Sequence, residues 1–295
     1  MAHADADIEV DFDRDWIAII RRGLRRGGHT PAVDDQRASF QFFNLQKRLV
    51  EPKPRRVHVS NAFECPREHQ RGYDELRRKV ESGDDVRPHL SRFLADLDKN
   101  DALLNDWGIH HLHLGTTIES DGFAARTGPV LFVRFESADA YFIAIQEHGA
   151  WSDKRMLDVV QENWPTVFDR FQMVGVVGLE RELSSEEIAG MRKAGIQTFS
   201  QLGAGRVIGP PGGGYSTSGL AIDVVRASDH HRDQVRLWEE WLVKNKTTIL
   251  ERLRAAGKTL ARPAILRLEL SEHGAHVVGT TADGEPFAFK IPPSR

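Results

Sequence analysis

The first 105 residues carry apolar side chains mostly at helical spacing. In residues 12–26, Trp16, Ile19 and Ile20 recur at the three- and four-residue intervals that place side chains on one face of a helix, and Gly27 ends the pattern. The same reasoning predicts further helices over 36–50, 66–82 and 88–98, and a short strand over 56–60. The sequence therefore predicts a mainly helical N-terminal region over residues 1–105.

Beyond residue 105 the apolar positions alternate as they do in strands. Residues 109–114 alternate between the two faces of an expected strand, residues 130–135 and 140–146 are rich in β-branched and aromatic side chains, and the polar loop 136–139 joins the last two segments. A short polar loop between two such segments predicts a β-hairpin. We expect the segment 109–114, which bears three histidines, to be a central strand of its sheet.

The rest of the chain mixes the two patterns. Ser184 and Glu187 have the spacing of a capping box, which predicts a helix ending at Gly195, and Asp229 is expected to cap a long helix over 229–256. Another helix is predicted over 153–163. Strands are predicted over 171–179, 206–208, 220–225, 265–270, 275–279 and 286–291, and the last three are expected to form a meander with a turn at Asp283-Gly284.

These elements predict an α+β fold: a helical N-terminal region followed by a mixed, mainly antiparallel sheet domain, a long C-terminal helix and a terminal β-meander. The expected division is a helical region over 1–105, an α+β domain with the histidine-bearing strand over 106–260, and the meander over 261–295.

Composition narrows the class of protein. The chain has 295 residues, of which 40% are hydrophobic and 28% charged, which is too much apolar content for a disordered chain. It contains no apolar run long enough for a membrane span, and its acidic N-terminal segment is unlike a secretory signal. Its single cysteine, Cys65, forms no internal disulfide, so a reducing cytoplasm is the expected location.

The net charge of −3 is a cancellation between segments of opposite sign. Ten Lys and Arg face five Asp and Glu over residues 47–79, whereas eight acids face four bases over 153–187. The total argues against a broadly basic nucleic-acid-binding protein, but it leaves room for a local basic face that binds an anion. The alternative is that these charges are solvated helix faces that pair with one another.

The segment Trp107-Gly-Ile-His-His-Leu-His-Leu-Gly115 is the strongest candidate for chemistry. On a strand, His111 and His113 point to one face and His110 to the other. Paired imidazoles suit acid–base cleavage of a phosphodiester, in which one takes a proton from the nucleophile and another protonates the leaving oxygen. They also suit a metal ion, with Glu119 or His148 as the third ligand. The third interpretation is structural: the rings are hydrogen-bonded within the sheet.

Residues 109–148 carry His113-Leu-Gly115, Arg126, the strand Val130-Leu-Phe-Val-Arg-Phe135 and His148 after the next strand. This segment resembles the C-terminal sheet of RelE/HigB-like toxins, which are messenger-RNA endonucleases. The resemblance implies that Arg126 and Arg134 hold phosphate and that His148 takes part in proton transfer. It also implies RNA as a substrate and an antitoxin protein as a partner.

Other motifs are less informative. The glycine-rich segment 209–219 lacks the Gly-Lys-Ser/Thr ending of a P-loop, and its serines lack the spacing of a nucleophile elbow, so a mobile surface loop is expected there.

Three hypotheses about function remain. The leading one is a toxin-like endoribonuclease without metal or other cofactor, with His111, His113 and His148 as catalytic residues and Arg126 and Arg134 binding phosphate. The second is a metal-dependent hydrolase with a histidine cluster. The third is a non-catalytic protein that binds a partner or nucleic acid, which predicts hydrogen-bonded histidines with no open cleft beside them.

Overall fold

The structure is a computed structural model that describes residues 8–261, 263–272 and 274–291. It has the predicted α+β class. The described residues form two compact units, one made of those within 1–42 and 226–295 and the other of those within 43–225. The units do not follow the expected division at residues 105 and 260, because the first helix packs against a strand near the C-terminus.

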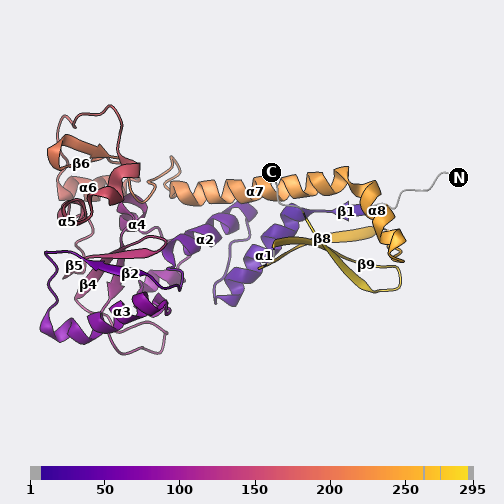
Figure 1. Cartoon of the computed structure of the whole chain (residues 1–295), viewed down its shortest axis with the longest axis horizontal. Coiled ribbons are helices and arrows are strands. Elements are labelled where there is room, and N and C mark those ends of the chain that lie inside the picture. The colour runs from indigo at the N-terminus through magenta and orange to yellow at the C-terminus, as the bar shows by residue number, and fades with distance from the viewer. Residues whose placement is uncertain (1–7, 262, 273, 292–295) are drawn as a thin grey trace. The chain divides into compact units, whose positions relative to one another are not determined.

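The unit formed by the two ends of the chain contains a four-stranded sheet in the order β1-β8-β9-β10 (Figure 1). The predicted meander is confirmed as β8 (Ala264–Ser271), β9 (Gly274–Thr280) and β10 (Pro286–Lys290). The short β1 (Ile8–Val10) adds to β8 in parallel. Helix α1 (Phe12–Arg26) has the predicted bounds and buries Phe12, Trp16, Ile17, Ile20 and Leu24.

The central unit is built on a sheet in the order β2-β5-β4-β3. The predicted hairpin is confirmed as β4 (Pro129–Phe135) and β5 (Asp139–Glu147), with β2 (Arg56–Val59) parallel to β5. The histidine-bearing β3 (His110–His113) pairs only with β4 among the strands of this sheet, so it is an edge strand and the expectation of a central one is wrong. An edge position leaves one side of the strand open to ligands.

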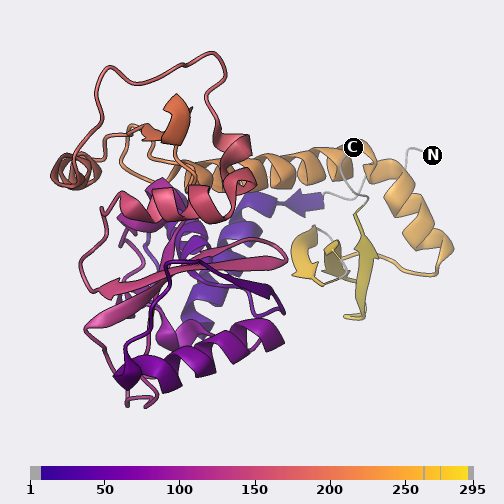
Figure 2. The same cartoon turned by 60° about the vertical axis from the view of Figure 1, so that its left-hand side comes forward.

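Helices cover both faces of this sheet, as Figure 2 shows for α3 (Gln70–Ser82) and α5 (Arg155–Asn163). Successive side chains of β4 and β5 point alternately toward α5 and toward α3. Val130 and Phe132 belong to the core formed with Met156, Leu157 and Val160 of α5. On the opposite face, the ring of Phe142 packs edge-on against Tyr73 of α3, with 6.1 Å between centroids.

The remaining elements complete the two units. They are the helices α2 (Asp35–Arg48), α4 (Ala102–Trp107), α6 (Ser185–Lys193), α7 (Ile222–Lys244) and α8 (Lys246–Ala255), the 3₁₀ turns η1 (Arg67–His69), η2 (Arg87–His89), η3 (Arg92–Ala95), η4 (Pro165–Phe171) and η5 (Gly203–Gly205), and the strands β6 (Ser200–Leu202) and β7 (Arg206–Ile208). The capping box at Ser184 and Glu187 is present at the start of α6. No helix in the described ranges combines the length and apolarity needed to cross a membrane.

Two predicted elements have a different conformation. Residues 88–98 form short 3₁₀ turns instead of one α-helix, because Leu90 and Ser91 are extended and the Ser91 hydroxyl accepts a hydrogen bond from Phe93 N to start a new turn. Residues 171–179 are not a buried strand: Val174 and Val177 are 95% and 93% exposed, and Gly175 has a φ of +84° that interrupts extended structure.

The long C-terminal helix begins earlier than predicted. Residues 220–225 are not a strand, since α7 starts at Ile222, and Asp229 therefore lies within the helix and does not cap it. Gly219, with a φ of +78°, turns the chain just before this start. The sequence was misleading here because the apolar residues of 220–225 fit a buried first turn as well as a strand.

Candidate metal centre

Three histidines meet on one side of the central sheet because of its register. His111 lies opposite Phe132 and His113 opposite Val130 in the β3–β4 ladder, and Val130 lies opposite Gln146 in the β4–β5 ladder. Side chains in register share a face, and His148 follows Gln146 by two residues. The sheet therefore directs His111, His113 and His148 to the face that carries α5.

The ring nitrogens of these residues converge. One nitrogen from each ring lies within 4.8 Å of one nitrogen from each of the others. The ring centroids are 6.2 Å apart for His111 and both other rings, and 5.7 Å apart for His113 and His148. Nitrogens bound to one zinc ion at 2.0–2.1 Å lie about 3.4 Å apart. The exposed His148 follows the end of β5, and its ring packs against those of His113 and Trp151.

Desolvation favours the uncharged form of these imidazoles, most strongly for the two on β3. Desolvation lowers the pKa of His113 to about 4, and it lowers the pKa of His111 in the same direction. The pKa of His148 is lowered by desolvation and by the nearby guanidinium of Arg126. A neutral imidazole offers the lone pair that a metal ion needs, whereas a general acid must be protonated. The lowered pKa values therefore argue against a protonated imidazole that acts as a general acid.

Several ring nitrogens lack partners within the described protein. The Nδ1 atoms of His111 and His113, and both ring nitrogens of His110, are buried and accept or donate no hydrogen bond there. Leaving such atoms unpaired costs about 1–3 kcal/mol each. The structural interpretation of the strand requires hydrogen bonds to the histidine rings, and these four nitrogens make none in the described protein.

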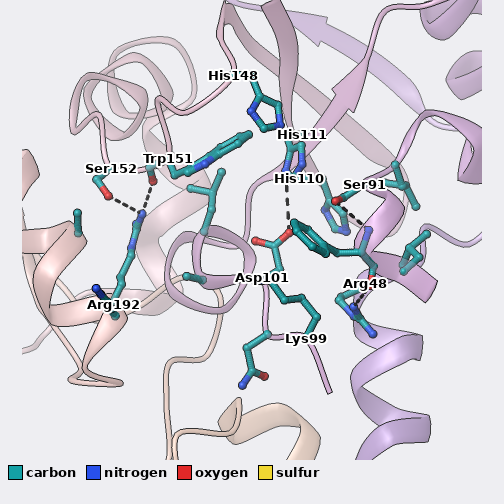
Figure 3. A pocket seen from close by; sticks show the side chains of 18 of the residues that line it. Arg48, Ser91, Lys99, Asp101, His110, His111, His148, Trp151, Ser152 and Arg192 are labelled. Atoms are coloured by element: carbon teal, nitrogen blue, oxygen red, sulfur yellow. Dashed lines mark hydrogen bonds and ion pairs between the residues drawn. The ribbon is translucent and has the colours of Figure 1, made fainter. Parts of the chain in front are cut away.

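Asp101 lies beside the histidine cluster (Figure 3). Its Oδ1 accepts a hydrogen bond from Leu104 N at the start of α4, which fixes the carboxylate. Its Oδ2 lies 3.9 Å from Nδ1 of His111. At this distance the carboxylate makes no hydrogen bond to the ring, but Asp101 is the one carboxylate of the cavity lining and lies next to a possible ligand. A carboxylate beside the second ring nitrogen orients many metal-bound histidines.

A cavity of about 380 Å³ opens beside the cluster (Figure 3). His110, His111 and His148 line it together with the half-buried ring of Trp151, which lies 4.5 Å from the ring of His111. Its size is that of a small-molecule site. An open cavity beside the histidines is the opposite of what the non-catalytic hypothesis predicts.

The two predicted phosphate-binding arginines are not together. Arg126 lines the cavity, and it has no hydrogen bond or ion pair with any residue in the described ranges. Arg134 is 3% exposed and lies away from the cavity lining; it pairs with Glu136 at 2.8 Å and donates to the carbonyl of Trp107 at 3.0 Å. A role of Arg134 in binding phosphate at this cavity is therefore wrong. Glu119, the alternative third metal ligand, is ion-paired with Arg92.

The glycine-rich segment supports the site instead of forming a mobile surface loop. Gly212 N donates to Asp106 O at 2.9 Å and Gly214 N donates to Asn105 O at 2.8 Å. A Cβ at Gly212 would lie 2.0 Å from Leu104 O, so only glycine fits this close approach to α4. The segment thus holds the helix that begins at Asp101.

Sequence reasoning found the three histidines and Arg126 but missed Asp101 and α4. The signal for the helix was the Asp101-Ala-Leu-Leu104 run, an N-cap residue followed by apolar positions. The ring of Trp151 packs against Phe132, with 5.7 Å between centroids, and it also lines the cavity.

Comparison of this chain with models of protein families, with curated proteins and with solved structures finds no match. The function therefore has to be inferred from the chemistry of the site.

Proposed function

We propose that this protein is a metal-dependent hydrolase in which His111, His113 and His148 bind one zinc-type ion beside the cavity. The observation that carries the proposal is the convergence of three ring nitrogens within 4.8 Å of one another, with His111 and His148 of this cluster lining a small-molecule-sized cavity. Three histidines with an open fourth position are a recurrent ligand set of catalytic zinc. An ion held in this way lowers the pKa of a bound water toward 7 and so supplies a nucleophile at neutral pH.

The residues of the chain have separate tasks in this proposal. The three imidazoles hold the ion, Asp101 orients His111, and Arg126 attracts an anionic group of the substrate. Trp151 and the buried leucines of the lining exclude water from one side of the cavity. We also propose a cytoplasmic location, since the single Cys65 needs no oxidising compartment.

The second candidate is the metal-independent, toxin-like endoribonuclease, with RNA as substrate and an antitoxin as partner. The observation in its favour is the unpaired Arg126 beside His148, which supplies a cation for a phosphate. It requires one protonated imidazole, which the lowered pKa values of all three rings oppose.

Chelation separates the two candidates. We expect activity on a panel of chromogenic phosphate and carboxylate esters to be lost after dialysis against a chelator and restored by zinc. Under the second candidate, cleavage of an RNA oligonucleotide would continue in the chelator. Such chelator-resistant RNA cleavage, dependent on His148, would overturn the metal-dependent proposal.

The substitution Asp101→Asn tests the positioning of His111. Asparagine caps a helix about as well as aspartate, so α4 should persist while the negative charge beside His111 is lost. We expect the zinc affinity to fall about 10- to 100-fold, the usual effect of losing such a carboxylate. Competition with a chromogenic chelator measures the affinity. An unchanged affinity at unchanged thermal stability would show that Asp101 does not act on the metal.

A further inference from the structure

The charges that line the cavity are strongly unbalanced. Its lining includes one carboxylate, that of Asp101, and five Lys or Arg side chains: Arg48, Lys99, Arg126, Arg192 and Lys193. The whole chain, by contrast, has a net charge of −3. The excess of cations is therefore a local feature of this cavity, and it favours an anionic occupant.

The cations differ in how far they are already engaged. Arg48 donates to three backbone carbonyls, those of Asn44, Phe93 and Asp96. Arg192 pairs with Asp106 at 2.8 Å. Arg126 is exposed and has no partner in the described part of the chain, and its charge acts on all three histidines. Arg126 is thus the side chain free to bind an anionic group next to the histidine cluster.

Another part of the lining is apolar. Leu90, Leu94 and Leu103 are buried side chains of the cavity wall, and Phe93 lies among them with 53% of its surface exposed. The ammonium group of Lys99 lies over the Phe93 ring, 4.4 Å from its centroid. An exposed aromatic ring next to apolar walls offers surface to an apolar or aromatic part of a ligand.

We propose that the cavity binds a small phosphate ester of an apolar or aromatic alcohol, with its phosphate between Arg126 and the three histidines and its organic part against Phe93 and Leu94. Arginine suits this group because its planar guanidinium donates two parallel hydrogen bonds to phosphate oxygens. The surplus of positive charge suits the two negative charges of a phosphate monoester better than the single charge of a carboxylate.

This inference rests on the proposed hydrolase and names its substrate. In the reaction, a water oxygen forms a bond to phosphorus and the bond from phosphorus to the alcohol oxygen breaks. The alcohol oxygen leaves with the bonding electron pair and takes up one of the water's protons, so that the products are an alcohol and inorganic phosphate. No oxidant, reductant or second substrate is needed.

The test is calorimetric titration of the zinc-loaded full-length protein with phenyl phosphate, benzoate and inorganic phosphate. We expect phenyl phosphate to bind more tightly than the other two, because only it has both the phosphate and the aromatic part. Arg126→Gln should weaken phenyl phosphate binding roughly 10- to 100-fold. The matched control is Arg71→Gln, an exposed arginine on α3 outside the cavity lining, which should bind as the wild type does.

The outcomes separate this inference from the proposed function. Zinc binding without phenyl phosphate binding, or equal binding of benzoate, would overturn the substrate class and leave the metal site standing. Binding of phenyl phosphate that depends on Arg126 in a protein that takes up no zinc would support the substrate class and overturn the metal-dependent hydrolase. An effect of Arg71→Gln equal to that of Arg126→Gln would show nonspecific attraction and would also overturn the inference.

Discussion

Replacement of His113 by alanine is expected to abolish both stoichiometric zinc binding and hydrolytic activity. His113 is 3% exposed, one of its ring nitrogens lies within 4.8 Å of one ring nitrogen each of His111 and His148, and the other two histidines of the cluster are already used as ligands. Zinc at one hundred times its dissociation constant should stabilise the wild-type protein by about 2.7 kcal/mol. The variant should show no such stabilisation in thermal or urea unfolding with and without zinc.

The control for this variant is His230→Ala, which removes an exposed histidine of α7 outside the cluster. It should keep the full zinc-dependent stabilisation. If His113→Ala retained the stabilisation, or if His230→Ala lost it, zinc would be bound elsewhere on the protein and the assignment of the site would be wrong.

A large loss of stability is expected when Asp106 is replaced by asparagine. The side chains of Asp106 and Arg192 are 2% and 4% exposed and form an ion pair at 2.8 Å. The guanidinium also lies over the ring of Trp107, 4.0 Å from its centroid. The substitution leaves the buried charge of Arg192 unpaired, and breaking such a pair costs about 3–5 kcal/mol. Urea unfolding monitored by circular dichroism measures the change.

An exposed ion pair of the same unit serves as the comparison. Arg77 and Glu81 lie one turn apart on α3, and about half of each side chain is exposed, at 45% and 46%. Glu81→Ala should change the free energy of unfolding by about 0.2–0.5 kcal/mol. Equal effects of Asp106→Asn and Glu81→Ala would show that the Asp106–Arg192 pair does not hold α4 to α6.

Local patterns in the sequence predicted the elements whose residues interact with near neighbours. Helix α1 and the capping box at Ser184 depend on side chains a few residues apart, and the β4–β5 hairpin depends on a short polar loop. The shared face of His111 and His113 follows from strand alternation alone. The sequence alone therefore predicts these features.

Features that depend on contacts between distant segments of the chain cannot be predicted from these local patterns. The pairing of β1 with β8 joins residues about 250 positions apart, and the burial of Arg134 depends on the carbonyls of Trp107 and Pro211. The edge position of β3 likewise follows from strand order, which a hydrophobic pattern does not encode.

The most direct test of the metal centre is the metal content of the untagged full-length protein. The protein is incubated with zinc, freed of unbound metal by gel filtration, and analysed for zinc beside a variant that replaces His111, His113 and His148 by alanine. We predict close to one zinc ion per wild-type chain and none bound by the variant. A wild-type protein that retains no more zinc than the variant would contradict the proposed metal centre.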